Sequence, residues 1–491
     1  MAVDVLHGPP VEGSVANVQR RRAFSVAALI IFLFAFWLGV QAPIGIMSAT
    51  DELLTAERTR EMLMTEPLVV HFNFEPSFEK PPLQYWLTSL TLARFQNRAV
   101  AVRVWPLFYA VLTLLAVGWL VRLLKPNEPW LVPLSFAILI SAPFFNSESA
   151  RGLLDIGLTF FTVLTFVFAE LARKKPAWWI ATAVASWLGS LQKFPIPFLF
   201  WMLIIAVRLM NRPDRRELRS GRGWLIGSVV AALALMSIWP LLQLIKYQMP
   251  VGSVFHDEVV VWLGPEWLGR RPYFEIPIGM SLAGGLCGFL SLVAPFVILF
   301  SKKERASPVI RELVIVSLSF IAIVILSNFR NARYSIPVLP SLCFLLALVF
   351  YRFLRQASPV RTWAITALII LLVAGFVHGQ IKINVRRLDV ANEKVIAEKL
   401  GELQQPGVQT VLIKSLFPRN ELMWDSFYLF HGNFRFPVTK FTTQEIRANS
   451  PKPPLIGVSV ARDFPVVREL YPNVQVELTR AQFVCWQVPA E

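Results

Sequence analysis

Two carboxylates stand together directly after the first long apolar run of the chain. Asp51 and Glu52 open the segment TDELLTAERTREML. An acidic residue at the start of an amphipathic helix, here expected over 52–64, caps the free N–H groups of the first turn. The same pair at a membrane boundary can instead supply a general base that deprotonates an acceptor hydroxyl. The residues alone leave both roles open.

A glutamate and a lysine precede the next predicted helix, in HFNFEPSFEKPPLQYWL. The two prolines after Lys80 fix an extended entry and then start a helix, so Glu79 and Lys80 are expected at its mouth. A cation beside a helix N-terminus binds anions. The structural alternative is a lysine that snorkels at the edge of a membrane.

A third candidate segment, KYQMPVGSVFHDEVVVWLGPEWLGRRPYFEIP, lies in the middle of the chain. Its Arg270 and Arg271 directly precede an apolar run. Arginine binds phosphate through two parallel hydrogen bonds, so this pair predicts a phosphate clamp. Interfacial anchoring of the apolar run is the alternative.

These residues lie between apolar runs, and the chain as a whole is too apolar for a soluble protein. Of its 491 residues, 55% are hydrophobic and 16% are charged, whereas a soluble domain carries about 25% charged residues. This composition excludes disordered, coiled-coil and collagen-like proteins. The net charge of +16 comes from short basic groups between apolar runs. Such groups orient membrane helices, so no nucleic-acid partner is expected.

The apolar runs predict a polytopic α-helical membrane protein. Eleven membrane helices are expected, or up to thirteen because several runs are short or abut. Their cores lie at 23–47, 104–121, 129–147, 156–172, 176–192, 194–207, 223–245, 276–301, 313–329, 334–351 and 362–381. The segments between the runs fall alternately on the two sides of the membrane. Those on the side of the N-terminus hold 21 lysine and arginine residues, and those on the other side hold 13. The N-terminus is therefore expected in the cytoplasm and the C-terminus outside it.

The predicted layout has three parts. Residues 1–22 form a cytoplasmic tail, 23–381 a transmembrane domain with long outer connections at 48–103 and 246–275, and 382–491 a soluble extracytoplasmic domain. In this last part, VIAEKLGELQQ and DFPVVRELYP predict helices, and VQTVLIKSL, LIGVSV and VQVEL predict strands. The alternation indicates a small α/β fold.

Seven short motifs follow one another over roughly residues 20–350: TDE, REML, FEKPPLQYWL with AVRVWP, ARGLLDIGLTFF, LGSLQKFPIPFL and RNARYSIPVLPSL. In this order and spacing the sequence resembles the superfamily of aminoarabinose transferases and protein O-mannosyltransferases. Its members are polytopic membrane glycosyltransferases of the GT-C class. The resemblance implies an inverting transfer of a sugar from a polyprenyl-phosphate donor to an envelope acceptor.

The resemblance also implies roles for individual residues. Asp51 stands at the position of the catalytic aspartate, Glu52 completes the acidic pair, and Asp155 matches the acidic residue of the next outer loop. Lys80 stands where the family binds the donor phosphate, with Glu79 beside it. Arg270 and Arg271 are counted with it as phosphate ligands because of their residue type and not because of the resemblance.

Further residues fall in the same motifs. Glu79, Lys193 and Tyr334 are expected to contact the donor or acceptor sugar. The aminoarabinose branch has an arginine close after its acidic pair, where this chain has Leu53 and Leu54. Arg58 or Arg60 would have to supply that contact, and Arg58 is counted with the phosphate-binding residues.

No cofactor is expected to be required, although one metal site is conceivable. His256 resembles a loop histidine that, in the aminoarabinose branch, helps to bind a metal together with the glutamate of the Glu-Lys-Pro segment, here Glu79. One histidine and one glutamate are too few for a zinc site, and inverting transfer from a lipid phosphate needs no metal.

The function expected from the sequence is therefore that of a glycosyltransferase in a bacterial inner membrane, surrounded by membrane lipids. Donor candidates are aminoarabinose, mannose, galacturonic acid or another sugar on a polyprenyl phosphate, and acceptor candidates are lipid A, another glycan or a protein. A transporter or flippase of lipid-linked glycans is the alternative, and would place ionisable residues in mid-membrane. A membrane scaffold is a third interpretation, which leaves the charged clusters of the outer face without a role.

The excess of basic residues gives a testable topology. A reporter that is active only outside the cytoplasm is expected to be active when fused after Glu491, and one active only in the cytoplasm to be silent there. Fusions within the basic connection 208–222 serve as the matched control and should give the opposite result. Cytoplasmic reporter activity after Glu491 would contradict the orientation.

Overall fold

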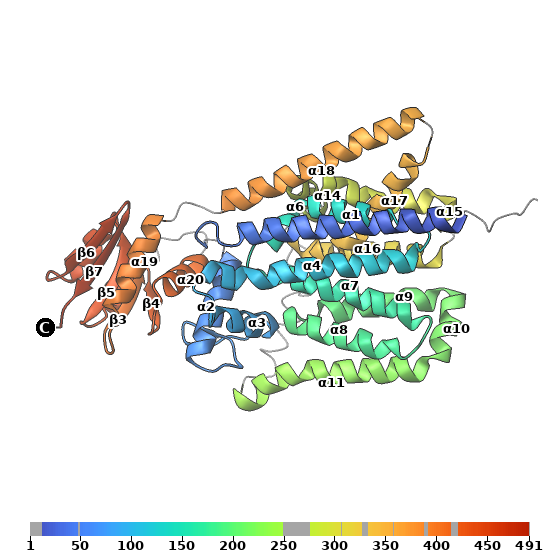
Figure 1. The fold of residues 1–491 in the computed structure, drawn as a ribbon. Coiled ribbons are helices and arrows are strands. Elements are labelled where there is room, and N and C mark those ends of the chain that lie inside the picture. The colour runs from blue at the N-terminus through green and yellow to red at the C-terminus, as the bar shows by residue number, and fades with distance from the viewer. Residues whose placement is uncertain are drawn as a thin grey trace, which may run out of the picture. The chain divides into compact units, whose positions relative to one another are not determined.

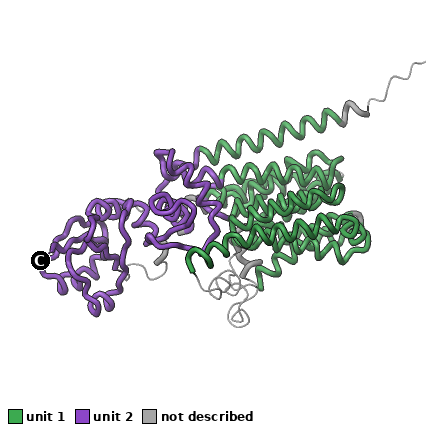
Figure 2. Tube along the Cα trace, turned by 90° about the horizontal axis from the view of Figure 1, so that it is seen from below, with its two compact units in different colours: residues 1–39, 107–149, 155–380 green, residues 40–106, 150–154, 381–491 purple. Residues whose placement is uncertain are grey.

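The computed structural model describes residues 12–47, 50–248, 275–305, 307–326, 332–356, 358–386, 391–413 and 421–490. The chain forms two compact units, coloured separately in Figure 2. Unit 1 comprises residues 1–39, 107–149 and 155–380. Unit 2 comprises residues 40–106, 150–154 and 381–491.

Unit 1 is built from helices (Figure 1), and most of them are apolar. The elements wholly or mainly within it are α1 (Glu12–Gln41), α4 (Arg98–Leu124), α5 (Leu131–Ser141), α6 (Pro143–Ser149), α7 (Asp155–Ala172), α8 (Trp178–Gln192), α9 (Ile196–Met210), α10 (Arg212–Ser220), α11 (Arg222–Lys246), α14 (Glu275–Phe300), α15 (Lys302–Arg305), α16 (Pro308–Leu326), the 3-10 helix η3 (Ala332–Val338), α17 (Leu339–Leu354) and α18 (Ser358–Arg386).

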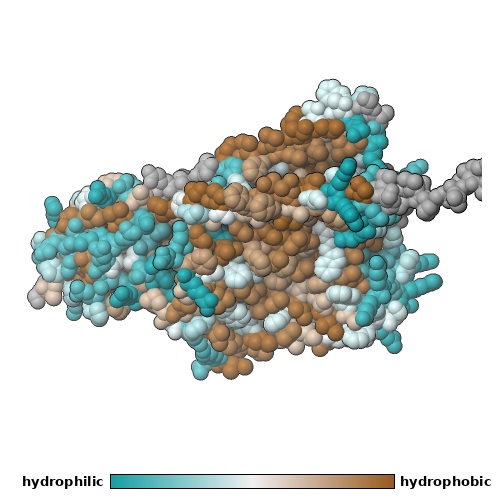
Figure 3. All heavy atoms as spheres, viewed as in Figure 1, coloured by the Kyte–Doolittle hydropathy of each residue, from teal (hydrophilic) through white to brown (hydrophobic). Residues whose placement is uncertain are grey.

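Large apolar side chains on the outside of unit 1 mark it as a membrane domain. Phe32 of α1 is 65% exposed and Trp363 of α18 is 76% exposed. Figure 3 shows apolar side chains over most of the visible face of this unit. A continuous apolar surface of this kind is suited to lipid and not to water.

Every predicted membrane run coincides with a helix in the described residues, but fewer helices reach spanning length. Seven are long and apolar enough to cross a membrane: Asn17–Gln41, Arg98–Leu124, Asp155–Ala172, Arg222–Lys246, Pro308–Leu326, Arg333–Leu354 and Pro359–Ile381. Two bent pairs, α5 with α6 (74°) and α9 with α10 (115°), raise the count to nine. The described residues thus hold seven to nine candidates instead of eleven. The difference arises because α8 has only 15 residues and α14 is broken at Gly285. The predicted polytopic helical fold is confirmed.

A buried ion network joins four helices of unit 1. Arg208 of α9 donates from Nε to Glu312 of α16 at 3.0 Å and also hydrogen-bonds Glu170 of α7. Arg173, just after α7, donates to Asp214 of α10 at 2.6 Å and pairs with Glu312 as well. Arg208 and Glu312 are each 2% exposed. Buried charges are tolerated only when they are paired in this way.

The N-terminal part of unit 2 is the segment predicted as the first outer connection. It contains α2 (Thr50–Met64), the two-stranded antiparallel pair β1 (His71–Phe72) and β2 (Glu75–Pro76), and α3 (Leu83–Leu92). The helix expected over 52–64 is therefore confirmed and begins two residues earlier.

The C-terminal part of unit 2 is a five-stranded mixed sheet with helices. Its elements are α19 (Ala391–Leu403), β3 (Gln409–Ile413), α20 (Glu421–His431), β4 (Val438–Phe441), α21 (Thr443–Asn449), β5 (Leu455–Val460), α22 (Phe464–Leu470), β6 (Gln475–Arg480) and β7 (Phe483–Val488). The strand order is β4-β3-β5-β7-β6. Strands β4, β3 and β5 run parallel, whereas β7 is antiparallel to β5 and β6. The predicted α/β domain is confirmed.

Helices cover both faces of this sheet. Successive residues of a strand point to opposite faces, so neighbouring residues of one strand lie in different cores. Leu412 of β3 lies in one apolar core with residues of α19 and α20, and its neighbours Val411 and Ile413 lie in a second core with residues of α21 and α22. The first core also contains Leu53 and Ala56 of α2. The segment that contains α2 and the C-terminal sheet therefore share one hydrophobic core.

Hydrogen bonds reinforce this packing within unit 2. Asn73 exchanges two hydrogen bonds with the backbone of Val438, at 3.0 and 2.8 Å. Arg60 of α2 donates to the carbonyl of Phe434 at 2.6 Å.

The predicted domain boundary at 381/382 follows the membrane crossings, whereas the grouping by packing joins residues 40–106 to the C-terminal part.

The ion network predicts a large loss of stability when one member is removed. Arg208→Gln leaves two buried carboxylates short of a partner, so the free energy of unfolding is expected to fall by about 3 to 5 kcal/mol. Thermal unfolding of the purified protein in detergent measures the effect. Arg219→Gln, an exposed arginine of α10, is the matched control, and equal melting temperatures of the two variants would contradict the structural role.

Candidate functional site

Asp51 lies inside the first turn of α2 and not at the cap position expected from the sequence. The helix begins at Thr50, and the Thr55 hydroxyl donates to the Asp51 carbonyl at 2.8 Å as part of that turn. The residue is half-buried, whereas Glu52 beside it is buried. The two neighbouring carboxylates therefore have different environments.

Glu52 is held in a buried ion pair with Arg103, near the start of α4. The guanidinium donates to both carboxylate oxygens, at 2.7 Å from Nε and 3.2 Å from Nη2. Its third nitrogen donates to the carbonyls of Ala42 and Ile44 at 2.9 and 2.8 Å. Burial raises the pKa of Glu52, but the charges of Arg103 and Arg151 outweigh it and hold that pKa below its ordinary value. The lowered pKa and the ion pair with Arg103 favour the ionised form of Glu52.

A glycine completes the environment of Glu52. The backbone N–H of Gly152 donates to Glu52 Oε1 at 3.0 Å. A β-carbon at this position would lie 2.2 Å from the side chain of Val102. The backbone can approach the carboxylate only because residue 152 has no side chain.

Arg58 forms the cationic part of the site in unit 2. Its Nη2 donates to Glu79 at 2.5 Å and its Nη1 contacts the Tyr85 hydroxyl at 3.5 Å. The guanidinium also lies 5.6 Å from the centre of the Phe72 ring. Arg58 is 2% exposed, and its buried Nε has no hydrogen-bond partner among the described residues. A buried N–H without a partner is rare in folded proteins.

Lys80 and Asp51 belong to the same electrostatic group. Lys80 is half-buried and stands two residues before the cap of α3, as predicted. Burial raises the pKa of Glu79, but Arg58, with a smaller effect from Lys80, holds it below the ordinary value. Burial raises the pKa of Tyr85, and the negative charge of Asp51 adds to this shift. The structure thus brings the predicted Asp51, Arg58, Glu79 and Lys80 into one group.

Arg60 does not belong to this group. It donates to both carboxylate oxygens of Glu57, at 2.8 and 2.6 Å, and to the carbonyl of Phe434. Of the two arginines considered in place of Leu53 and Leu54, Arg58 is the one that contacts Glu79.

A second group of predicted residues meets in unit 1. Lys193, directly after α8, pairs with Asp155 of α7 at 2.8 Å, and its ammonium lies 4.5 Å from the ring centre of Tyr334. Arg333 contacts the other oxygen of Asp155 at 3.5 Å. Asp155 and Lys193 are both buried. Gly157 lets α7 approach the end of α8, because a β-carbon there would lie 2.5 Å from the amide of Gln192.

Sequence reasoning missed the groups that position these side chains. Arg103 lies in the quoted AVRVWP motif and Gly152 in ARGLLDIGLTFF, but neither received a role. Tyr85 and Arg333 also lie in quoted motifs. Arg103 could have been found from the sequence, because it is a charged residue inside the otherwise apolar motif AVRVWP.

Three predicted residues, His256, Arg270 and Arg271, lie outside the described part of the chain. Within the described ranges there is no cluster of three or more histidine, cysteine or acidic side chains able to hold a metal. Glu79, the other predicted metal ligand, pairs with Arg58.

Comparison with known families supports the resemblance. Residues 25–249 match the family model described as dolichyl-phosphate-mannose-protein mannosyltransferase. This stretch contains the group around Asp51 as well as Asp155 and Lys193.

Two bacterial relatives carry the same description, undecaprenyl phosphate-alpha-4-amino-4-deoxy-L-arabinose arabinosyl transferase. The protein of Pseudomonas savastanoi pv. phaseolicola is 27% identical over 343 residues, which are 66% of this chain and 62% of the relative. That of Pseudomonas paraeruginosa is 26% identical over 352 residues, 70% of this chain and 62% of the relative. The match spans less than two thirds of either relative.

Solved structures share the fold. ArnT from Cupriavidus metallidurans bound to undecaprenyl phosphate superposes with a TM-score of 0.67 at 16% identity and covers 98% of this chain and 99% of its own. The oligosaccharyltransferase of Archaeoglobus fulgidus superposes with a TM-score of 0.62 at 11% identity, over 89% of this chain and 69% of its own. The chain therefore has the GT-C fold.

The acidic cluster of α2 predicts a pH-dependent stability. Burial, the charge of Glu57 and a hydrogen bond with it raise the pKa of Glu61 from 4.5 to about 8. The folded state binds this proton more tightly than the unfolded chain does. The resulting contribution to the free energy of unfolding is complete below about pH 4.5 and is lost as the pH rises through about 8. The melting temperature of the wild type should thus fall over this range more than that of Glu61→Gln, which cannot ionise. Glu75→Gln, at an exposed site of the same segment, is the control. Parallel pH profiles of wild type and Glu61→Gln would contradict the shift.

Proposed function

We propose that this protein is an inverting membrane glycosyltransferase that moves a sugar from a polyprenyl-phosphate donor to an acceptor in the bacterial cell envelope. One observation carries the proposal: the half-buried Asp51 shares its electrostatic neighbourhood with Tyr85, which also contacts the buried cation Arg58. The enzymes named for such donors among the similar proteins give the substrate class.

Asp51 suits the attacking hydroxyl group of the acceptor, and Arg58 suits the leaving phosphate of the donor. The acceptor hydroxyl attacks the anomeric carbon of the donor, and the bond from that carbon to the phosphate oxygen breaks. The bonding pair leaves with the polyprenyl phosphate, and the hydroxyl proton passes to Asp51 as general base. Attack from the side opposite the leaving group inverts the anomeric centre.

Negative charge grows on the phosphate as the bond breaks. Arg58 and Lys80 are proposed to stabilise it, because cations aimed at developing charge act more strongly in the transition state than in the ground state. Glu79 holds the guanidinium in place through the ion pair at 2.5 Å.

The remaining predicted residues take supporting roles in this proposal. Glu52, already engaged with Arg103 and Gly152, positions Asp51 and does not itself accept a proton. Asp155, Lys193 and Tyr334 form the second polar group, which is assigned to a sugar. Arg270 and Arg271 are retained as additional phosphate ligands on the basis of the sequence.

No metal is required in the proposed reaction, because protein cations supply the charge that a Lewis acid would provide. The chain is placed in the inner membrane with its N-terminus in the cytoplasm, in line with the distribution of basic residues. The site would then face the outer side.

Asp51→Asn tests the catalytic assignment. Asparagine keeps the shape of the side chain but accepts no proton, so the rate is expected to fall by about 100-fold to 10,000-fold. Loss of the charge from the first turn of α2 should cost only about 0.3 to 1 kcal/mol of stability. Transfer from a purified undecaprenyl-phosphate aminoarabinose donor to isolated envelope glycolipid measures the rate, and EDTA is present throughout.

Glu393→Gln is the matched control, because Glu393 also lies in the first turn of a helix, α19, and outside the site. It should leave the rate within about twofold. A rate for Asp51→Asn within a few-fold of wild type, with normal thermal stability, would return Asp51 to a structural role.

A further inference from the structure

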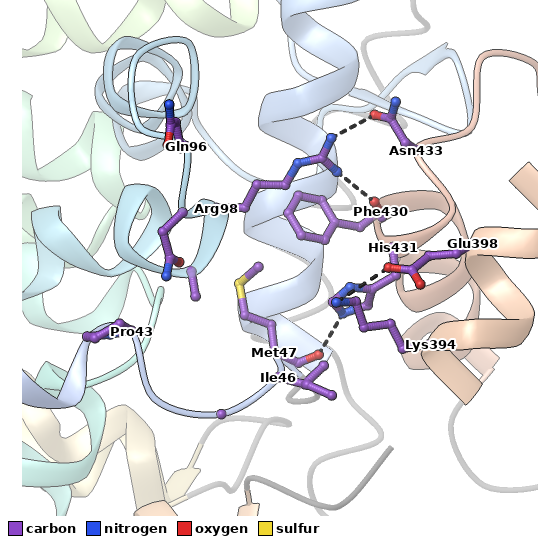
Figure 4. Close-up of a pocket in the computed structure, with 13 residues that line it drawn as sticks. Pro43, Ile46, Met47, Gln96, Arg98, Lys394, Glu398, Phe430, His431 and Asn433 are labelled. Carbon is purple, nitrogen blue, oxygen red and sulfur yellow. Dashed lines mark hydrogen bonds and ion pairs between the residues drawn. The ribbon is translucent and has the colours of Figure 1, made fainter. Parts of the chain in front are cut away.

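A polar cavity of about 420 Å³ lies within unit 2 and shares no residue with the group around Asp51. One wall comes from residues 43–47 and 96–99, and the other from α19 and α20. Figure 4 shows the labelled side chains around it. The volume lies within the range of about 300 to 1,000 Å³ that is usual for small-molecule sites.

Arg98 is fixed at the edge of this cavity. Its guanidinium donates to the carbonyl of Phe430 at 3.2 Å and to the side-chain oxygen of Asn433 at 3.1 Å, and lies 5.4 Å from the Phe430 ring centre. Two of its five N–H groups are thereby engaged among the described residues. The side chain is exposed, so its other donors are accessible to a ligand.

The facing wall carries an ion pair and a histidine. Lys394 and Glu398 lie 3.4 Å apart on successive turns of α19. His431 donates from Nε2 to the carbonyl of Met47 at 3.0 Å, since a carbonyl can only accept. Burial lowers the pKa of His431 to about 4. The imidazole is therefore neutral at pH 7, and its Nδ1 is an acceptor.

The charges of the lining do not cancel. Glu398 balances Lys394, which leaves Arg98 without an acidic counterpart in the cavity wall. The amides of Gln96, Asn97 and Asn433 add paired donors and acceptors. Arginine matches a phosphate or carboxylate, and amides with a carboxylate match hydroxyl groups.

The cavity is also longer than a single anion needs. A second hollow of about 410 Å³ shares part of its lining and continues along the same surface. The shared residues are Glu398, His431 and Asn433, and Glu402, Gln404 and Arg435 are added. The lining remains polar along its length.

We propose that this cavity is a binding site for an anionic saccharide, in which Arg98 and Lys394 hold the phosphate or carboxylate and Glu398 with the amides holds the hydroxyl groups. In the transfer reaction, this site would hold the glycan part of the acceptor at a distance from Asp51. This role rests on the proposed function.

The charges of the lining give opposite expectations for two conservative substitutions. Full-length protein in nanodiscs is titrated with glucose 6-phosphate and with galacturonic acid, without any donor, and saturation-transfer NMR gives the dissociation constants. Lys394→Gln should weaken binding about tenfold, as expected for loss of a charged hydrogen bond. Glu398→Gln keeps an oxygen that accepts hydrogen bonds from the hydroxyl groups but removes the negative charge that repels the anionic group, so it should tighten binding several-fold.

Both substitutions fall on a partly exposed pair of one helix, so neither should impair folding. Arg98→Gln should weaken binding at least as much as Lys394→Gln. Arg462→Gln, an exposed arginine of unit 2 outside the cavity, is the control and should bind like wild type. Glucose and inorganic phosphate alone should each bind at least tenfold more weakly than glucose 6-phosphate.

Three results would overturn the site. These are absence of binding of both anionic sugars to wild type, equal affinity of Lys394→Gln and Glu398→Gln, and binding of glucose or phosphate as tight as that of glucose 6-phosphate. The titration needs no turnover and is repeated on Asp51→Asn. Lost saccharide binding with normal transfer would reject this site alone, and normal binding without transfer by wild type would reject the proposed function alone.

Discussion

The buried pair of Glu52 and Arg103 is the constraint on which the candidate site depends. Removal of two charges from water costs several kcal/mol for each ion, and close hydrogen bonds must compensate for it. Arg103 meets this demand with both oxygens of Glu52 and two backbone carbonyls, and Gly152 adds its N–H. These contacts tie the start of α2 to the start of α4 and to residues 150–154. Because Asp51 directly precedes Glu52 in α2, its place is set by the same contacts.

Much of the fold could be predicted because its signals are local. Apolar runs and alternating patterns identified the membrane helices, the first outer helix and three of the five strands in the large sheet. The short strand β4 and the strand β7 were missed, since β7 is an apolar stretch beside a turn and its pairing with both β5 and β6 is not local. The number of spanning helices was less predictable, because bends and short helices depend on packing and not on composition.

The site was predictable to the extent that a side chain's role follows from its type and local motif. Asp51, Arg58, Glu79 and Lys80 were predicted in this way, and the structure places them in one group. The sequence could not show that Asp51 is half-buried while Glu52 is buried and paired, because the pairing of Glu52 depends on Arg103, 51 residues further along the chain. Likewise, the contact of Lys193 with Asp155 and Tyr334 joins positions that are far apart in the sequence.

The core shared by α2 and the C-terminal sheet has a consequence for the exchange of parts between related proteins. Leu53 and Ala56 pack with Phe427 and Phe430, so the C-terminal part is no independent module that a chimera could replace at residue 382. A foreign sheet would bring different side chains against α2, and Asp51 lies on that helix. Residues 40–106 and 381–491 must therefore be inherited or transplanted together, and substitutions on one side of this core constrain those accepted on the other.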